Sequence, residues 1–305
     1  MATPKKRSIV VIANRYAGRS SESARQEVIA DLADRFDPEV VWTAGRDTGT
    51  AIAEQACDAG AELVVAYGGD GHVNEVVNAL AGTDVPLGII PGGTMNVFAR
   101  ALGIPGNARA AVEHLVSIRR RPSRRVNLGK MDDRFFTFSA GCGFDAEAAE
   151  LVESHLEGKR RLGEPFFYWS ALRVLAGSYR HRSPTMTIDG AFGSVPVSMA
   201  IACNAGPYAY LFGRPIRLTP EVELEGGLDL FALRRMRLEA LPWYAWGSAV
   251  SGDMSGHPDA FTVHEAGEFT ITSSKSFHRH VDGEPLPTAT KTSFSLHRNA
   301  LSVLA

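Results

Sequence analysis

The sequence predicts an α/β protein with two domains, an N-terminal, mostly parallel α/β domain followed by a C-terminal antiparallel β-sandwich. In residues 1–125, short apolar runs alternate with amphipathic stretches, an order typical of a mostly parallel sheet covered by helices. After this segment, strand-like runs separated by turn residues dominate. The chain has 305 residues, more than one typical domain, so two hydrophobic cores are expected.

Each element of the first half is predicted from its hydrophobic period. Apolar runs of strand length occupy residues 9–13, 39–43, 62–67 and 86–90. Apolar residues recur at helical spacing between and after these runs, at residues 21–35, 48–59, 72–81 and 107–118.

The second half contains mainly strands, expected at residues 133–139, 185–189, 195–203, 228–234, 268–273, 277–281 and 293–297. Two helical stretches interrupt them, around residues 145–157 and 166–180. The basic run at residues 119–125 separates the two halves. Such a run is commonly a solvated linker, although it could also attract anionic headgroups.

Composition and charge narrow the class of protein. Hydrophobic residues make up 45% and charged residues 22%, and the net charge of −2 gives no general attraction for nucleic acid or anionic lipid. No apolar run reaches the ~18 residues needed to cross a bilayer, and no secretory signal is recognisable. The cysteines Cys57, Cys142 and Cys203 are widely spaced and suit a reducing compartment. We therefore expect a cytoplasmic protein.

Residues 68–71, Gly-Gly-Asp-Gly, are the most informative stretch. They follow an apolar run and precede residues at helical spacing, so they form a strand-to-helix turn. Glycines let backbone N–H groups approach a ligand, and the helix presents its positive N-terminal end, so the turn suits a phosphate. Because Asp70 would repel a phosphate unless a metal ion lay between them, we expect a nucleotide with Mg²⁺.

A second turn repeats this pattern at residues 91–96, Pro-Gly-Gly-Thr-Met-Asn. Thr94 and Asn96 are short hydrogen-bonding residues at a helix start, and Arg100 lies in the first turns of that helix. Neither turn matches the P-loop or the full dinucleotide-binding fingerprint. One such turn alone would be interpreted as a tight turn of an α/β domain. Two in series favour one phosphate ligand shared by neighbouring strand ends.

These turns resemble a known family. Residues 68–78 and 91–100 resemble the catalytic-domain signature of the diacylglycerol kinase family, which includes bacterial soluble lipid kinases and the sphingosine and ceramide kinases. Residues 12–18, Ile-Ala-Asn-Arg-Tyr-Ala-Gly, resemble the family's first strand and its Asn-Pro-x-Ser/Ala-Gly loop. Residues 281–285, Val-Asp-Gly-Glu-Pro, resemble its Asp-Gly-Glu motif. NAD kinases resemble the first domain more distantly.

The resemblance implies an organisation of the chain and a set of ligands. Residues 1–125 would bind ATP and Mg²⁺, residues 292–305 would return to this domain, and residues 126–291 would bind the lipid, with the active site in the cleft between the domains. The candidate cofactor-binding residues are Asn14, Thr43, Gly68, Gly69, Gly71, Asn74, Glu75, Gly92, Gly93, Thr94, Asn96 and Arg100. The candidate metal ligands are Asp70 and Glu225.

For catalysis, the resemblance assigns Asp282 as the base that accepts the proton of the lipid hydroxyl. Glu284 would support this base or the metal, and Asp70 would act through Mg²⁺. Alternatively, Asp-Gly-Glu-Pro is only a hairpin turn. His278, His280 and Asp282 also alternate along a strand, a pattern that would suit a transition metal, but no further Cys or His pair lies nearby.

Several positions depart from the family pattern. His72 and Val97 stand where a threonine and an aspartate are usual, and Asn127 replaces an aspartate of many bacterial members. In the loop at residues 225–229, Gly226 occupies a position expected to be acidic, which puts a second, structural Mg²⁺ in question. Neutral residues could still hydrogen-bond water around a single ion at Asp70.

Aromatic segments of the second half could hold an acyl chain, although core packing is the commoner role of such residues. These segments are residues 165–169, 207–212 and 241–246.

We therefore expect an ATP-dependent kinase of a lipid hydroxyl, converting diacylglycerol to phosphatidic acid at the inner face of the membrane. It would contact the membrane transiently and bind no nucleic acid, and a homodimer is left open. One alternative is a kinase of a soluble acceptor, similar to NAD kinases. The other is a non-catalytic nucleotide-binding regulator, against which the retained Asp70, Asp282 and Glu284 argue. Diacylglycerol, monoacylglycerol, sphingoid bases and polyprenols all carry a primary hydroxyl, so the sequence does not identify the lipid.

Overall fold

The computed structural model divides into two compact units, Met1–Val126 with Asn299–Ala305, and Asn127–Arg298. The residues of two strands, β5 (Arg124–Met131) and β16 (Glu284–Val303), are divided between the two units. The predicted α/β class, with parallel strands in the first half and antiparallel strands in the second, is confirmed. The structure describes residues 9–15, 21–45, 47–155, 169–170, 172–174, 177, 185–211, 214–240, 243–244, 247 and 254–305.

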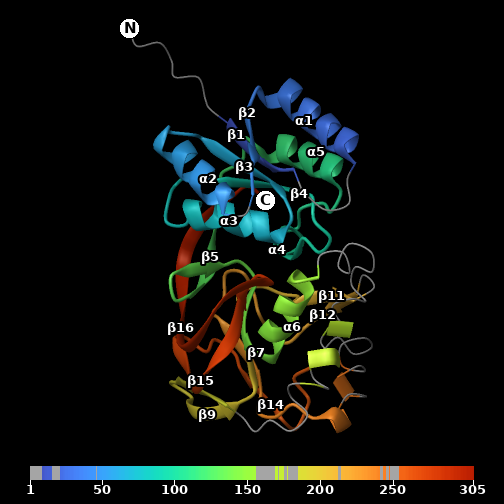
Figure 1. Ribbon diagram of the computed structural model, residues 1–305. Helices are drawn as coiled ribbons and strands as arrows, with labels where there is room; N and C mark the ends of the chain where they lie inside the picture. Colours follow the sequence, from blue (N-terminus) through green and yellow to red (C-terminus); the bar gives the residue numbers. More distant parts are fainter. Residues whose placement is uncertain are drawn as a thin grey trace. The chain divides into compact units, whose positions relative to one another are not determined.

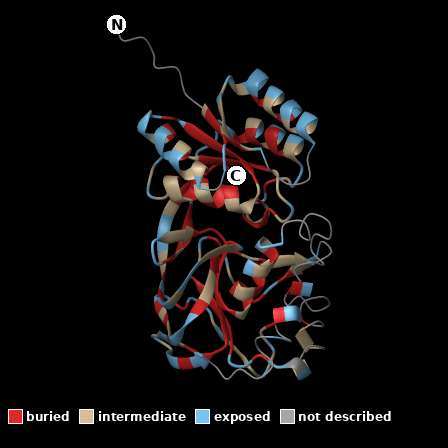
Figure 2. Cartoon of the chain, in the orientation of Figure 1, coloured by how far each residue is buried: buried red, intermediate tan, exposed pale blue. Residues whose placement is uncertain are grey.

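The first unit is built on a parallel sheet with the strand order β4-β3-β1-β2. Its strands are β1 (Ile9–Asn14), β2 (Glu39–Thr43), β3 (Leu63–Gly68) and β4 (Leu87–Pro91). The end of β16 pairs in parallel with β4, where Val303 lies opposite Leu87. β3 and β4 are buried along their whole length, which explains why they are continuous apolar runs (Figure 2).

Helices cover both faces of this sheet, with α1 packed on α5 and α2 packed on α3 (Figure 1). Ser21 caps α1 by accepting a hydrogen bond from the Ala24 N–H, and Asn107 caps α5 by accepting from Arg109 and Ala110. The helices are α1 (Glu22–Phe36), α2 (Thr48–Asp58), α3 (Asp70–Leu80), α4 (Val97–Ala101) and α5 (Ala108–Ile118).

The second unit is an antiparallel sheet whose main path runs β14-β13-β10-β7-β15-β16. β5 pairs with β16 and β6, and β8 pairs with β15 and β9, so that the strands enclose one large apolar core. Besides β5 and β16, its elements are β6 (Arg134–Phe136), β7 (Ser139–Gly143), α6 (Phe144–Glu153), β8 (Met186–Gly190), β9 (Gly193–Val197), β10 (Met199–Cys203), β11 (Ala209–Leu211), β12 (Arg214–Ile216), β13 (Asp229–Leu233), the 3₁₀ helix η2 (Leu238–Ala240), β14 (Ala260–Val263) and β15 (Phe269–Val281).

Two long strands differ from the prediction. The two predicted segments 268–273 and 277–281 fall in the single strand β15, which begins at Phe269 and has register shifts between Thr272 and Phe277 and between Phe277 and Arg279. β16 runs for 20 residues, far beyond the predicted 293–297. Its additional residues were not predicted because most of them are polar and show no hydrophobic period. β5 was not predicted because it begins inside the basic run, where Arg124 and Arg125 are exposed.

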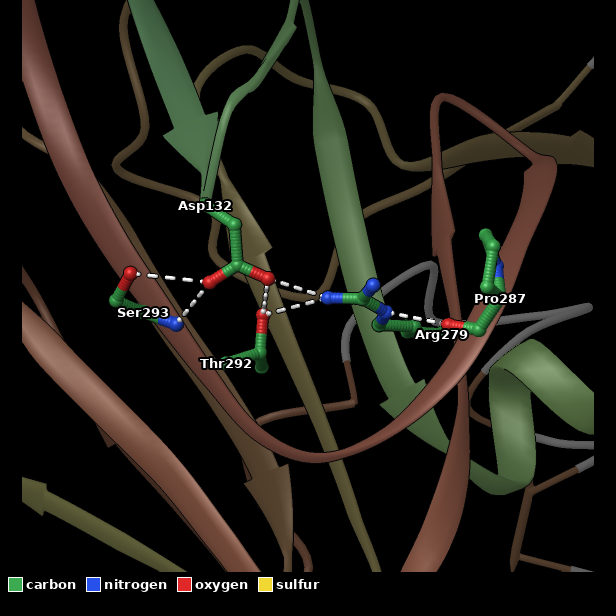
Figure 3. Close-up of polar contacts among 5 residues, drawn as sticks. All are labelled: Asp132, Arg279, Pro287, Thr292 and Ser293. Atoms are coloured by element: carbon green, nitrogen blue, oxygen red, sulfur yellow. Dashed lines mark hydrogen bonds and ion pairs between the residues drawn. The ribbon is translucent and has the colours of Figure 1, made fainter.

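A polar clamp fixes the turn between β5 and β6 to these long strands (Figure 3). Asp132 Oδ1 accepts hydrogen bonds from the N–H of Ser293 at 2.8 Å and from its hydroxyl at 3.1 Å. Asp132 Oδ2 accepts from the Thr292 hydroxyl at 2.9 Å and from Arg279, whose Nε also donates to the Pro287 carbonyl at 2.6 Å. Burial opposes ionisation, but these hydrogen bonds outweigh it and hold the pKa of Asp132 below its usual value.

Candidate functional site

The carboxyl ends of the parallel strands gather several of the predicted binding residues. Asn14 and Thr43 are paired at the ends of β1 and β2, and Gly68 pairs with Pro91 at the ends of β3 and β4. The chain leaves β1 toward one edge of the sheet and β3 toward the other. Ligands of open α/β sheets bind at such a reversal of direction, outside the carboxyl ends of the strands.

The two glycine turns touch each other at this edge. The Gly92 N–H donates to the Gly68 carbonyl at 2.8 Å. A Cβ atom on Gly93 would lie 2.6 Å from the Gly69 Cα, and one on Gly69 would lie 3.2 Å from the Gly93 Cα. Only residues without side chains allow this approach. The two motifs therefore form one continuous backbone surface, as expected for a ligand shared by neighbouring strand ends.

Asn96 shapes the second turn from inside. Its backbone adopts a φ of 48°, its Oδ1 accepts from the Gly93 N–H at 2.9 Å, and its Nδ2 donates to the Gly93 carbonyl at 2.9 Å. The side chain is buried, so it holds the loop in place. Thr94 and Arg100, in contrast, are exposed and accessible to a ligand.

Asp70 is the first residue of α3 and is half-buried beside the glycine turns. Its Oδ1 accepts a long hydrogen bond of 3.4 Å from the N–H of Phe98 in α4. One carboxylate that faces a nucleotide's phosphates is the usual protein contribution to a Mg²⁺ site, since this ion keeps several waters. The donor set around Asp70 therefore fits a nucleotide-bound Mg²⁺.

Glu75 and Asn74 have contacts within the fold. The two oxygens of Glu75 accept from the N–H groups of Asp47 at 2.9 Å and Gly49 at 2.8 Å, at the beginning of α2. Asp47 provides no side-chain cap there, so Glu75 caps this helix. Asn74 is buried and accepts from the Asn78 side chain at 3.0 Å. These contacts favour structural roles for both residues over the predicted nucleotide contact.

Two of the departures from the family pattern are explained by packing. His72 Nε2 donates to the Ile12 carbonyl at 2.9 Å and so ties α3 to β1. Burial lowers the pKa of His72 below its ordinary value, which keeps the ring neutral and suited to this bond. Val97 is 2% exposed at the start of α4.

The loop at residues 225–229 does not fit a second Mg²⁺. The Asn127 side chain donates directly to the Gly226 carbonyl at 2.9 Å, and its N–H donates to the Leu224 carbonyl at 3.2 Å. Asp229 Oδ1 accepts from the Glu265 N–H at 3.0 Å and lies 2.9 Å from His264 Nδ1. No group of three His, Cys, Asp or Glu side chains able to hold a metal occurs in the described part of the chain. Hydrogen bonds fix the loop in place of an ion, and exposed Glu225 is a poor metal-ligand candidate.

Asp282 is buried at the β15–β16 hairpin and its carboxylate is fully engaged. Oδ1 accepts from the N–H groups of Phe138 at 3.0 Å and Ser139 at 3.1 Å. Oδ2 accepts from the N–H and the hydroxyl of Thr137, both at 2.8 Å. Burial raises the pKa of Asp282, and these hydrogen bonds oppose the rise. A carboxylate offers about four lone pairs, so this one has none left for a substrate proton. Glu284, in the same hairpin, is partly exposed.

A polar cluster of buried Asp145 and His280 with partly buried Tyr208 adjoins the same hairpin. Asp145 accepts from His280 Nε2 and from the Tyr208 hydroxyl at 2.5 Å. His280 Nδ1 accepts from the Gly283 N–H at 3.2 Å, so Nε2 carries the hydrogen. The cluster thus ties the turn between Asp282 and Glu284 to α6. Asp145 and Tyr208 were not predicted, because a lone aspartate at a helix start and a tyrosine in an aromatic run form no motif.

The candidate lipid-contacting segments are described only in part. Residues 165–168, 212, 241–242 and 245–246 lie outside the described residues. Trp169 is 46% exposed, whereas Trp243 packs on His257 with 4.4 Å between the ring centroids. In the described part of the chain, no helix is both long enough and apolar enough to span a bilayer.

Comparison with known proteins shows which family the first part of the chain is similar to. Residues 8–131 match the family model of the diacylglycerol kinase catalytic domain. The diacylglycerol kinase of Bacillus subtilis is 33% identical over 195 residues, which cover 62% of this chain and 60% of the relative, less than two thirds of its length. A Pseudomonas aeruginosa protein named "probable lipid kinase YegS-like" is 28% identical over 309 residues, covering 98% of this chain and 94% of the relative.

Solved structures share the fold over nearly the whole chain. The crystal structure of a diacylglycerol kinase from Bacillus anthracis has a TM-score of 0.73 at 23% identity, covering 99% of this chain and 98% of that one. An NAD kinase from Archaeoglobus fulgidus in complex with ATP has a TM-score of 0.52 at 11% identity, covering 98% and 93%. The resemblance inferred from the glycine turns is thus confirmed: residues 8–131 are similar to the diacylglycerol kinase catalytic domain.

Proposed function

We propose that the protein is a kinase that transfers the γ-phosphate of ATP to the hydroxyl of a lipid, with diacylglycerol as the substrate and phosphatidic acid as the product. The observation that carries this proposal is the contact between the two glycine turns beside Asp70 at the carboxyl ends of β3 and β4. The similarity of residues 8–131 to the catalytic domain of a kinase family supports a nucleoside triphosphate as the ligand of that surface.

The phosphates would lie on the backbone N–H groups of the two turns, with Thr94 and Arg100 exposed nearby to bind them. Asp70 would hold Mg²⁺ together with the phosphate oxygens. When bound, this ion would neutralise charge on the phosphates during transfer. Asn96 would act indirectly by keeping the second turn in shape.

For the proton of the acceptor hydroxyl we propose Glu284 as the base. A general base needs a lone pair directed at the proton that it accepts, and the carboxylate of Asp282 has four donors already. Asp282 would fix the hairpin that carries Glu284, which reverses the roles expected from the motif. His280 and Asp145 would support the same hairpin through the hydrogen bond from the Gly283 N–H to His280.

The acceptor would be a membrane lipid, so we also propose transient contact with the membrane surface. Diacylglycerol is favoured because a relative that is 33% identical carries that name. A soluble acceptor such as NAD is the alternative, supported by the shared fold of the ATP-bound NAD kinase.

Incubation with labelled ATP, Mg²⁺, a panel of dispersed lipids and NAD tests the proposal. We expect label on a lipid with the wild-type protein, loss of label with Asp70→Asn, and retained label with Asp58→Asn, a matched change at an exposed aspartate of the same unit. Label on NAD alone would favour the soluble acceptor. Binding of ATP without transfer to any acceptor would favour the regulator.

A further inference from the structure

The first unit has a hollow at the amino ends of the strands whose carboxyl ends carry the glycine turns. It is a cavity of about 490 Å³, within the range of small-molecule sites. Ile9 and Leu63, the first residues of β1 and β3, line it together with Leu304. One strand length, roughly 17 Å, separates this cavity from the glycine turns.

The cavity is strongly cationic. Four arginines line it, Arg35, Arg119, Arg120 and Arg121, against the single carboxylate of Glu62. Like charges gathered around one hollow repel each other, and an anion bound between them relieves this repulsion. The basic run noted in the sequence is therefore one wall of a cavity whose other wall is the end of α1.

Contacts between the two walls hold the cavity in shape. Arg119 Nη1 donates to the Arg35 carbonyl at 3.2 Å, and the Arg119 guanidinium lies 5.4 Å from the centre of the Phe36 ring. Arg35 also pairs with Asp31 at 2.5 Å. In the part of the chain that the structure describes, Arg120 and Arg121 have no such partner, so their donors are available to a ligand.

We propose that this cavity, the arginine pocket (Arg35, Arg119, Arg120 and Arg121), binds a phosphate group joined to an apolar body, as in a lipid phosphate. Guanidinium groups match phosphate oxygens in pairs of parallel hydrogen bonds. The apolar side chains that line the same hollow, Ile9, Phe36, Leu63 and Leu304, would contact the rest of the ligand and favour it over free phosphate. The site goes beyond the proposed catalytic activity and uses none of its residues.

Vesicle binding tests the proposal. Phosphatidylcholine vesicles containing phosphatidic acid, or phosphatidylglycerol at matched charge, are mixed with the full chain in saturating ATP, which occupies the glycine turns. Arg120→Gln/Arg121→Gln should weaken binding to phosphatidic acid about tenfold or more, the effect of losing charged hydrogen bonds. The control is Arg235→Gln/Arg298→Gln, which removes the same amount of charge at exposed positions outside the pocket. This variant should bind phosphatidic acid vesicles like wild type.

Equal binding by the two double variants would overturn the arginine pocket, as would binding that follows vesicle charge and ignores the headgroup. Calorimetry with inorganic pyrophosphate in saturating ATP separates the sources of phosphate. Pyrophosphate binding that is lost in Arg120→Gln/Arg121→Gln, without vesicle binding, would support an anion site and overturn the lipid assignment. None of these readouts depends on phosphoryl transfer, so failure of the proposed function would show only in the labelled-ATP assay.

Discussion

Replacing Asp282 with asparagine should weaken the second unit as well as turnover, whereas Glu284→Gln should reduce turnover alone. The carboxylate of Asp282 accepts four hydrogen bonds, three of them from backbone N–H groups, inside the protein. An asparagine side chain has nearly the same shape but replaces one acceptor oxygen by an NH₂ group, a donor. Some of the donors around it must then lose their acceptor.

The structure sets the size of this effect. In place of Oδ1, the NH₂ group would face the N–H groups of Phe138 and Ser139. In place of Oδ2 it would face the Thr137 N–H and the Thr137 hydroxyl, which can turn and accept. The second orientation leaves one N–H unpaired, at a cost of about 1.5–3 kcal/mol for a hydrogen bond to a charged group. At about 2–4 °C per kcal/mol, Tm should fall by about 3–12 °C.

Thermal unfolding followed by far-ultraviolet circular dichroism measures the first effect, and transfer from labelled ATP to dispersed lipid measures the second. Glu284→Gln is the matched control, because it makes the same chemical change two residues away at a partly exposed position. If Asp282→Asn keeps the wild-type Tm and loses turnover, while Glu284→Gln keeps turnover, Asp282 is the base and the reassignment is wrong.

Three further predictions concern other parts of the chain. Gly93→Ala should weaken ATP binding about tenfold or more in calorimetry, because the alanine Cβ would lie 2.6 Å from the Gly69 Cα and push the two turns apart. Gly106→Ala is the control, because a Cβ there has no neighbour within 4 Å, and this variant should bind ATP like wild type. Burial holds the folded-state pKa of His72 below 6.5, so the stability that depends on its neutral form is present above pH 6.5 and is lost as pH falls. His72→Gln keeps a donor without titrating and should lose less stability than wild type in urea unfolding at acidic pH; parallel losses would contradict this assignment. Because the Asn127 side-chain amide holds the Gly226 loop, EDTA should not change the Tm of the nucleotide-free wild type. Asn127→Asp loses this donor, so its Tm should be lower without Mg²⁺ than with it. A wild-type Tm that falls with EDTA would indicate a structural ion.

The elements of the first unit follow closely from the sequence. Strands buried on both faces are continuous apolar runs, and helices that cover one face have a clear period, so residues 62–67 and 72–81 were recognised within two residues of β3 and α3. The second unit was less predictable where pairing rather than burial defines the strand. β16 runs on through polar residues because its neighbours satisfy its backbone, and no side-chain pattern records such pairing.

In the candidate site, too, some residue roles were predictable from the sequence and others were not. A glycine in the sequence marks a place where the backbone can approach another group closely, and the two glycine turns do contact each other. The role of a polar side chain depends on what the fold brings to it. Glu75 caps α2 because Asp47 and Gly49, 28 and 26 residues earlier in the chain, lie against it. Asp282 is saturated by donors from Thr137 to Ser139, more than 140 residues away, which a three-residue motif cannot reveal.

The negative charge of Asp70 points to a metal ion at the glycine turns. A carboxylate beside the phosphates opposes the binding of metal-free ATP, because two unit charges 4 Å apart repel by about 1 kcal/mol in water and about 4 kcal/mol near a protein surface. A divalent cation between the Asp70 carboxylate and the phosphates replaces this repulsion by attraction to both groups. Asp70→Asn should therefore bind ATP more tightly than wild type in EDTA and less tightly in Mg²⁺. Calorimetry under both conditions measures this reversal. If Asp70→Asn and wild type bind ATP equally well in both conditions, no metal ion lies between Asp70 and the phosphates, and the proposal of phosphoryl transfer at these turns loses its support.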